Sequence, residues 1–158
     1  MIEYQPIGIV HSPFKKVKGM PIQPVGAKDV AGHIEIRPDL QEGLKDLEGF
    51  SHIFVIYHLH KVSGCSLLVK PFLDKIEHGV FSTRVPKRPN PVGLSVLKLV
   101  SVEASIVHVE NLDILDGTPV IDIKPYVPKF DVWDAGKTGW FAGKAENAES
   151  YKADERFK

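Results

Sequence analysis

The sequence predicts a mostly β protein, a small single-domain sandwich or barrel with a few short helices. Its 12 prolines and 13 glycines are spread along 158 residues, which disfavours long uninterrupted helices. The apolar stretches between these breakers are short and β-branched, and several alternate with a period of two. Short strands that recur about every 8–12 residues between turn residues are typical of all-β sandwiches and barrels.

Six segments have the length and composition of strands. They span residues 7–11, 33–37, 51–58, 94–102, 106–109 and 120–124. The alternation is clearest from residue 105 to 110, where Ile106, His108 and Glu110 fall on one face and Val107 and Val109 on the other. This pattern predicts a half-buried strand.

Helices and turns make up a smaller part of the chain. Pro38 at a first helical turn predicts one short helix over residues 39–47, and residues 145–157 predict a polar C-terminal helix. The pair Asp116-Gly117 between two apolar runs predicts a hairpin. We assign residues 1–135 to the β domain and residues 136–158 to a C-terminal extension.

Composition excludes several classes of protein. Twenty Lys and Arg balance twenty Asp and Glu, so nucleic acid is not bound by bulk charge and any RNA contact must come from a local patch. The longest apolar run, residues 53–57, is too short to span a bilayer, and the N-terminus has no signal-peptide pattern. A single cysteine, Cys65, agrees with a reducing compartment, so we expect a cytoplasmic protein.

Charge is uneven along the chain even though it sums to zero. Residues 61–98 carry seven basic and two acidic side chains, whereas residues 99–122 carry five acidic ones and no Lys or Arg. Two explanations remain open. The segments pair across a sheet, or they form a basic face for a polyanion beside an acidic pocket for a cation.

Residues 79–95 contain three prolines, at positions 86, 89 and 91, and predict a stiffened loop that enters the strand at Leu94. A loop that is ordered before binding loses less entropy when it engages a ligand. This loop carries Arg84, Lys87, Arg88 and Asn90, and the planar guanidinium of arginine suits carboxylate or phosphate. The alternative is an ordinary basic surface loop.

Asp113 and Asp116 flank the predicted turn at a spacing that directs both carboxylates at one ligand, as acceptors for ribose hydroxyls or an ammonium group. The spacing does not match an EF-hand calcium loop, so we expect no metal here. A plain hairpin is the competing interpretation.

Three histidines are an even number of residues apart, at positions 52, 58 and 60, and would share one face of a regular strand. Packed core or interface histidines are favoured over a metal site, with one histidine as a ligand contact. Cys65 has no evident base beside it, so we do not expect a nucleophile. The sequence has no GxGxxG motif, and Gly136-Lys137-Thr138 lacks the leading glycine of a phosphate loop.

Aromatic residues cluster near the C-terminus, at Trp133, Trp140 and Phe141. Two interpretations are equally favoured: anchors that pack on a neighbouring subunit, and ordinary core packing.

Three segments together resemble one family. They are DLEGFSHIFVIY at 46–57, GVFSTRVPKRPNPVGLS at 79–95 and LDILDGTPVIDIKPYVP at 112–128, with IGIVHSPF at 7–14 and IQPVG at 22–26 nearby. These motifs are similar to those of the tRNA methyltransferase O family, also called YaeB-like, over about residues 4–130. The arginine-proline loop and DGTPVIDIKPY are its most specific parts.

The resemblance implies a small non-Rossmann β-barrel that works as a homodimer and binds S-adenosylmethionine near the subunit interface. It further implies methyl transfer to N6 of threonylcarbamoyladenosine next to the anticodon of certain tRNAs. Methyl transfer is an in-line displacement, so orientation and exclusion of water carry most of the catalysis. A base within reach of the N6 proton helps further, and Asp113, Asp116 or His60 are the candidates.

The resemblance also implies the residues of the site. Those matched to cofactor binding are Pro24, Val25, Gly26, His60, Lys61, Arg84, Leu94, Asp113, Ile114, Leu115 and Asp116. Arg84 with Asp113 and Asp116 form the expected catalytic set, since a sulfonium cofactor brings a positive charge and a carboxylate tail. The candidates for holding RNA or the threonyl carboxylate are Lys87, Arg88, Asn90, Lys124 and Tyr126.

Two other functions remain open. A non-catalytic RNA-binding barrel would use the same basic loop and bind RNA without the cofactor. A protein that binds S-adenosylmethionine and acts on a different small substrate is also compatible with this scaffold, because fold does not determine function.

Overall fold

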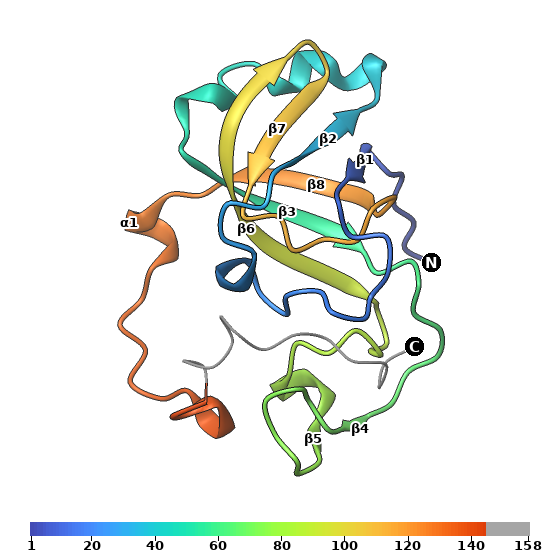
Figure 1. Ribbon diagram of the computed structural model, residues 1–158, viewed down its shortest axis with the longest axis vertical. Helices are drawn as coiled ribbons and strands as arrows, with labels where there is room; N and C mark the ends of the chain where they lie inside the picture. Colours follow the sequence, from blue (N-terminus) through green and yellow to red (C-terminus); the bar gives the residue numbers. More distant parts are fainter. Residues whose placement is uncertain (145–158) are drawn as a thin grey trace.

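The alternating segments form six strands that close into a barrel in the computed structural model, which describes residues 1–144 (Figure 1). The strands are β1 (Gly8–His11), β2 (Gly32–Ile36), β3 (His52–His58), β6 (Val92–Glu103), β7 (Ile106–Glu110) and β8 (Pro119–Pro125). Their order around the barrel is β1-β2-β7-β6-β3-β8, with antiparallel neighbours throughout. The predicted β-barrel and the six predicted strand positions are confirmed.

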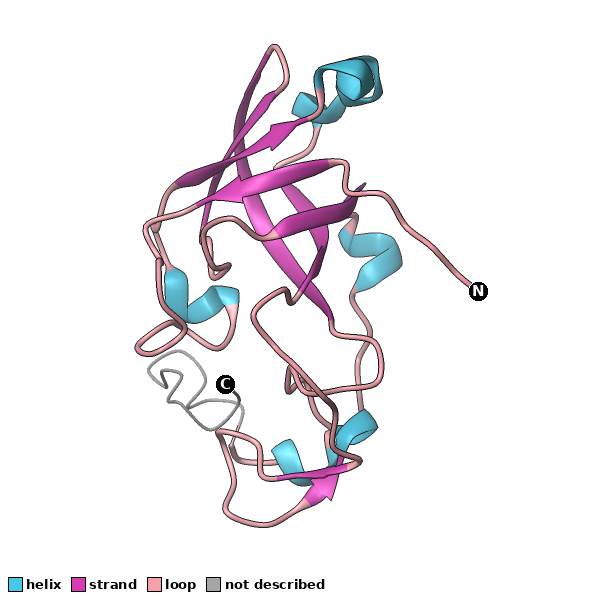
Figure 2. Ribbon diagram, turned by 90° about the vertical axis from the view of Figure 1, so that its right-hand side faces the viewer, coloured by secondary structure: helices cyan, strands magenta, loops and turns pink. Residues whose placement is uncertain are grey.

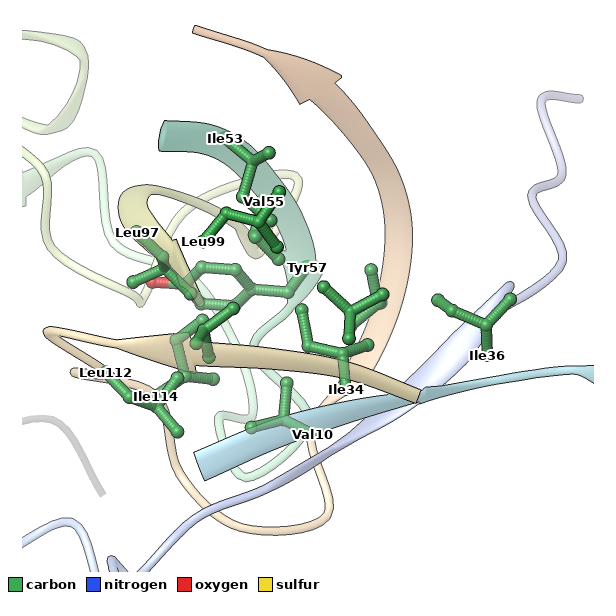
Figure 3. Packing of buried hydrophobic residues seen from close by; sticks show 13 residues of the cluster. Val10, Ile34, Ile36, Ile53, Val55, Tyr57, Leu97, Leu99, Leu112 and Ile114 are labelled. Atoms are coloured by element: carbon green, nitrogen blue, oxygen red, sulfur yellow. The ribbon is translucent and has the colours of Figure 1, made fainter. Parts of the chain in front are cut away.

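The barrel encloses one apolar core built from the inward residues of every strand (Figure 3). On β3 the inward residues are Ile53, Val55 and Tyr57, and on β6 Leu97 and Leu99 face them. Each such fully buried aliphatic side chain contributes about 1.5–3 kcal/mol relative to exposure. This shared core explains why strands far apart in the sequence close on one another.

The expected hairpin at Asp116-Gly117 is wrong. A turn does occur there, but β8 pairs with β3 and β1, whereas β7 pairs with β2 and β6. The connection between β7 and β8 instead enters the barrel, where Leu112 and Ile114 are 0% and 2% exposed. Burial of these two side chains favours a plug at the barrel end over a tight hairpin.

The predicted helix over 39–47 forms as two 3-10 helices, η2 (Pro38–Leu44) and η3 (Leu47–Gly49). Pro38 does begin the first of them, but Asp46 between them adopts a left-handed φ of 69° that no α-helix accommodates. The helix expected over 145–157 lies outside the described residues. Within residues 1–144, no helix combines the length and the apolar composition needed to cross a membrane.

A second, smaller unit lies at one end of the barrel in both views (Figures 1 and 2). We call residues 67–88 the satellite unit. It contains the two-residue strands β4 (Leu68–Val69) and β5 (His78–Gly79) and the 3-10 helix η4 (Val80–Ser82). Val69, Val80 and Val85 form its own small core with Phe72 against it.

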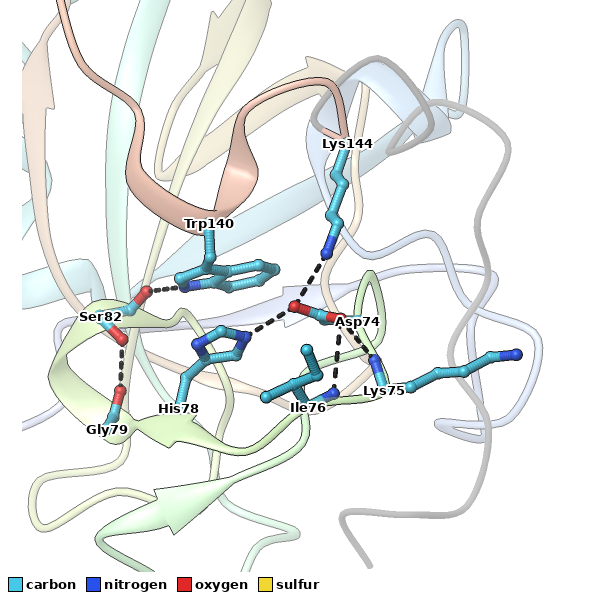
Figure 4. Close-up of polar contacts among 8 residues, drawn as sticks. All are labelled: Asp74, Lys75, Ile76, His78, Gly79, Ser82, Trp140 and Lys144. Carbon is cyan, nitrogen blue, oxygen red and sulfur yellow. Dashed lines mark hydrogen bonds and ion pairs between the residues drawn. The ribbon is translucent and has the colours of Figure 1, made fainter.

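The chain returns to the satellite unit after the barrel. Beyond α1 (Pro128–Asp131), the 3-10 helix η5 (Gly139–Phe141) places Trp140 against His78, with ring centroids 4.6 Å apart (Figure 4). Trp140 and Phe141 also stack on each other. Trp133, in contrast, is 83% exposed. Trp140 therefore packs on the satellite unit within its own chain but belongs to neither apolar core, and packing of these aromatics on a neighbouring subunit stays a prediction.

Candidate functional site

Side chains of the basic loop between η4 and β6 bind the loop's own backbone. Thr83 and Val85 are each 5% exposed, and the Thr83 hydroxyl donates to the Val80 carbonyl at 2.8 Å. The Arg88 guanidinium donates to the carbonyls of Thr83 and Val85 at 3.0 and 3.1 Å. One guanidinium nitrogen of Arg88, a residue predicted to hold RNA, therefore binds the backbone of its own loop. Of the other predicted RNA contacts on this loop, Asn90 is exposed and Lys87 is half-buried.

Arg84 projects from this loop toward a segment about 60 residues earlier. Its Nη1 donates to Oε1 of Gln23 at 3.0 Å. Gln23 is the residue before the 3-10 helix η1 (Pro24–Ala27), which contains the predicted cofactor turn and lies beside β6. Val25 in that turn is 59% exposed and Gly26 is half-buried. Two of the segments expected to form the site are therefore in direct contact.

The turn after β3 brings His60 and Lys61 to the same end of the barrel. The Leu59 amide donates to the Pro91 carbonyl at 2.8 Å, which fixes this turn against the end of the basic loop. Burial, with the nearby Lys61 and His58, lowers the pKa of His60. The expectation of one shared histidine face is wrong, because β3 ends at His58 and His60 lies beyond it in a turn.

A buried chain of hydrogen bonds runs from the barrel interior to Asp113. The Tyr57 hydroxyl lies 3.0 Å from Ser95 Oγ, which donates to Asp113 Oδ1 at 2.8 Å. Burial raises the pKa of Asp113 to about 6, despite the hydrogen bond from Ser95, and raises the pKa of Tyr57. A carboxyl group with a pKa near the working pH suits proton transfer.

Gly93 makes room for this chain. A Cβ atom at this position would overlap the Tyr57 ring, which lies directly over the glycine backbone opposite it in the β3–β6 register. Glycine therefore permits the tyrosine hydroxyl to reach Ser95.

Asp116 has a different environment. Its Oδ1 accepts from the Ser12 amide at 2.9 Å and its Oδ2 pairs with Lys15 Nζ at 2.8 Å, and these contacts lower the pKa of Asp116. Asp113 and Asp116 thus have separate partners within the chain, and their service of one ligand stays a prediction. Asp116 anchors the loop after β1 to the β7–β8 connection.

Other predicted residues of the 112–126 segment divide between core and surface. The side chain of Ile114 is buried in the core, and the Leu115 carbonyl accepts from the Thr118 hydroxyl at 2.6 Å. Lys124 is exposed and pairs with Asp122 at 2.9 Å, and Tyr126 packs edge-on against Phe54. Leu94 is 60% exposed on the outer face of β6.

The two oppositely charged segments do not pair along their length. Lys98 and Glu110 form an ion pair between them, at 3.0 Å across β6 and β7. Pairing across the sheet therefore leaves the basic loop's charge largely unexplained. No three His, Cys, Asp or Glu side chains within residues 1–144 converge in a way that could hold a metal ion.

Gln23, Tyr57 and Ser95 are not among the site residues predicted from the sequence. Ser95 could have been found from the sequence, because it alternates with Leu97 and Leu99 on the inward face of the same strand. A polar residue at a core position needs a hydrogen-bonding partner. Gln23 and Tyr57 carried no such signal.

Together, the fold and the site define a closed antiparallel barrel whose end is flanked by a basic loop and a carboxyl group of raised pKa. Residues 9–132 match the sequence model of the tRNA-methyltransferase O N-terminal domain, TrmO_N. The chain belongs to this family.

Relatives agree with this membership. A probable S-adenosyl-L-methionine-binding protein of Pyrococcus abyssi is 51% identical over 157 residues, which is 99% of this chain and 85% of the relative. A mouse tRNA (adenine(37)-N6)-methyltransferase is 38% identical over 134 residues, 80% of this chain and 31% of the relative. The crystal structure of TrmO from Pseudomonas aeruginosa superposes with a TM-score of 0.75 at 35% identity over 89% of this chain.

The chain spans 62% of the length of that solved structure and about a third of the mouse relative.

Proposed function

We propose that this chain is an S-adenosylmethionine-dependent methyltransferase that acts on tRNA, at N6 of the threonylcarbamoylated adenosine next to the anticodon. The contact between Arg84 and Gln23 carries the proposal, because it joins the basic loop to the turn at residues 24–26. Family membership and the names of the relatives support the chemistry.

The residues around this contact suit the cofactor's charges. The exposed guanidinium of Arg84 can hold a carboxylate tail, and the turn at Pro24, Val25 and Gly26 offers backbone groups beside it. His60, Lys61 and Leu94 complete the proposed cofactor contacts from neighbouring segments. When bound, the cofactor supplies an electrophilic methyl group on a sulfonium ion.

Asp113 serves as the general base in this proposal. Its pKa of about 6 leaves it mostly ionised at neutral pH yet basic enough to receive a proton. Asp113 would accept the N6 proton when the methyl group passes from the cofactor's sulfonium sulfur to N6. Ser95 and Tyr57 hold that carboxyl group in place from inside the barrel.

Basic and aromatic residues of two segments, the basic loop and the end of β8, are the proposed RNA contacts. Lys87 and Asn90 lie on the loop that carries Arg84, and Lys124 and Tyr126 lie at the end of β8. Arg88 supports the loop backbone and keeps other guanidinium donors for phosphate. Phosphate contacts of this kind position the RNA and carry no sequence information.

The outer face of β3 and β6 supports a homodimer with the cofactor near its interface. Phe54 lies opposite Val96, and Ile56 lies opposite Leu94, so outward apolar residues run across both strands. Leu94 is 60% exposed and Val92 is 43% exposed on this face. A contiguous exposed apolar face is typical of a protein interface. In this proposal residues 1–135 are the methyltransferase domain, and the protein acts on tRNA in the cytoplasm.

One alternative has a specific observation in its favour. Archaeal relatives such as the P. abyssi protein carry names that state cofactor binding and no acceptor. A different small acceptor on the same site is therefore the second candidate function.

Transfer of labelled methyl from S-adenosylmethionine to tRNA tests the proposal. Two tRNA preparations are compared, one with and one without threonylcarbamoyladenosine, and nucleosides are resolved by mass spectrometry. Label in methylated threonylcarbamoyladenosine from the first preparation alone supports the proposal. Cofactor binding without transfer to either preparation favours the alternative.

A further inference from the structure

The segment that follows the matched family domain is fastened to the satellite unit at two points. The family match ends at residue 132, whereas the contacts come from residues 139–144, which we call the strap. Trp140 Nε1 donates to the Ser82 carbonyl at 2.7 Å, and Lys144 Nζ pairs with Asp74 Oδ2 at 2.9 Å (Figure 4).

The Asp74 carboxylate, which accepts from Lys144, is held in place by other contacts as well. The Asp74 side chain is 8% exposed, and its carboxylate also receives His78 Nε2 at 2.7 Å and the Lys75 amide at 2.7 Å. Lys144, then His78 and the backbone amides, hold the pKa of Asp74 well below its usual range. An ionised carboxylate only accepts, so the Nε2 of His78 carries the proton in this contact.

The Trp140 anchor reaches the base of the Arg84 loop. The indole lies flat on the His78 ring, at 17° between planes, so ring stacking and one hydrogen bond act together. Its acceptor, Ser82, ends η4 and is two residues before Arg84. The Ser82 hydroxyl in turn donates to the Gly79 carbonyl at 2.7 Å.

The backbone around Ser82 determines where Arg84 lies. The two residues that flank it, Thr83 and Val85, are buried, so the backbone from Ser82 to Val85 has little freedom to shift independently. We infer that Trp140 and Lys144 are positioning residues, and that the strap fixes the Arg84 loop in the geometry that binds the cofactor. This inference rests on the proposed function.

Cofactor affinity of strap variants tests the inference, measured by calorimetric titration with S-adenosylmethionine well below the melting temperature. Trp140→Phe keeps the stacking and removes the hydrogen bond, and we expect Kd to rise about 3- to 10-fold, the ratio for one hydrogen bond. Lys144→Met removes the second anchor at a partly exposed site and should raise Kd about 2- to 5-fold. Trp133→Phe is the matched control, since Trp133 is exposed, and its Kd should equal that of the wild type.

Coupling between two sites is reciprocal, so the cofactor must also hold the strap more tightly. The sequence has two tryptophans, so Trp133→Phe leaves Trp140 as the sole tryptophan, whose emission is excited selectively over that of tyrosine. Saturating S-adenosylmethionine should lower acrylamide quenching of Trp140 in that variant. A strap with a merely structural role would change the melting temperature without changing either Kd or quenching.

The outcomes separate the two proposals. Wild-type binding with unchanged Kd in both folded strap variants, or with unchanged Trp140 quenching, overturns the strap inference and leaves the proposed function standing. Absence of cofactor binding by the folded wild type overturns the proposed function and the strap's role with it.

Discussion

Replacement of Asp113 by Asn should stabilise the protein at neutral pH while it abolishes methyl transfer. The folded protein raises the pKa of this carboxyl from 3.8 to about 6 because the group is buried, an effect that the hydrogen bond from Ser95 only partly offsets. Between about pH 4 and 6 the folded protein keeps a proton that the unfolded chain releases, so stability falls as the pH rises through this window. At 1.36 kcal/mol for each tenfold difference in acidity, the full penalty above pH 6 is about 3 kcal/mol.

Asn removes this penalty and retains an oxygen that accepts from Ser95. We therefore expect the free energy of unfolding of Asp113→Asn to exceed that of the wild type by up to about 3 kcal/mol at pH 7.5, and to equal it near pH 4. Urea unfolding followed by circular dichroism at a series of pH values measures this difference.

Asp116 provides a control of opposite sign, three residues away. Lys15 and the Ser12 amide lower its pKa, so its ionised form stabilises the fold and Asp116→Asn should lose stability at pH 7.5. A gain in Asp113→Asn that persists at pH 4, or no gain at pH 7.5, would refute the reasoning. Full methylation activity in Asp113→Asn would remove Asp113 from the mechanism.

Three further predictions concern the barrel. Gly93→Ala should lower the free energy of unfolding by about 1–3 kcal/mol, because the added Cβ overlaps the Tyr57 ring. Gly43→Ala is the control: its Cβ would meet no atom within 4 Å, so urea unfolding should show no loss of stability. Leu94→Glu should convert a homodimer to a monomer in sedimentation equilibrium, and Ile9→Glu, on β1 away from that face, should leave it a dimer. Burial and two neighbouring histidines lower the pKa of His33, so the stability of the fold should fall as the pH drops below about 6.5. In thermal melts, His33→Gln should lose less stability over this pH range than the wild type, and an equal loss would contradict this assignment.

Strand positions were predictable because alternation is a local signal. Residues 105–110 show it most clearly, and β7 spans Ile106–Glu110. Strand order was not predictable, because the pairing of β8 with β1 and β3 depends on which inward faces share the core. The hairpin predicted at Asp116-Gly117 was wrong for the same reason. Burial of Leu112 and Ile114 in the core outweighed the local preference of Asp-Gly for a hairpin turn.

For the site, too, local features were predictable from the sequence and contacts across the fold were not. The three prolines and Arg84 made the basic loop visible in the sequence, since each proline restricts its own backbone. Contacts across the fold were not visible, so Gln23 opposite Arg84 and Ser95 against Asp113 emerged from the structure alone. The satellite unit was missed because β4 and β5 contribute two residues each, too few for any periodicity.

Calorimetric titration of the wild type and of Arg84→Ala with S-adenosylmethionine tests the central claim most directly. We expect saturable binding to the wild type and an affinity at least about tenfold lower in Arg84→Ala, the effect of losing a charge-assisted hydrogen bond. Because Arg84 is exposed, the variant should keep the wild-type melting temperature. A folded wild type that gives no binding heat, or an Arg84→Ala variant that binds as tightly, would contradict the account.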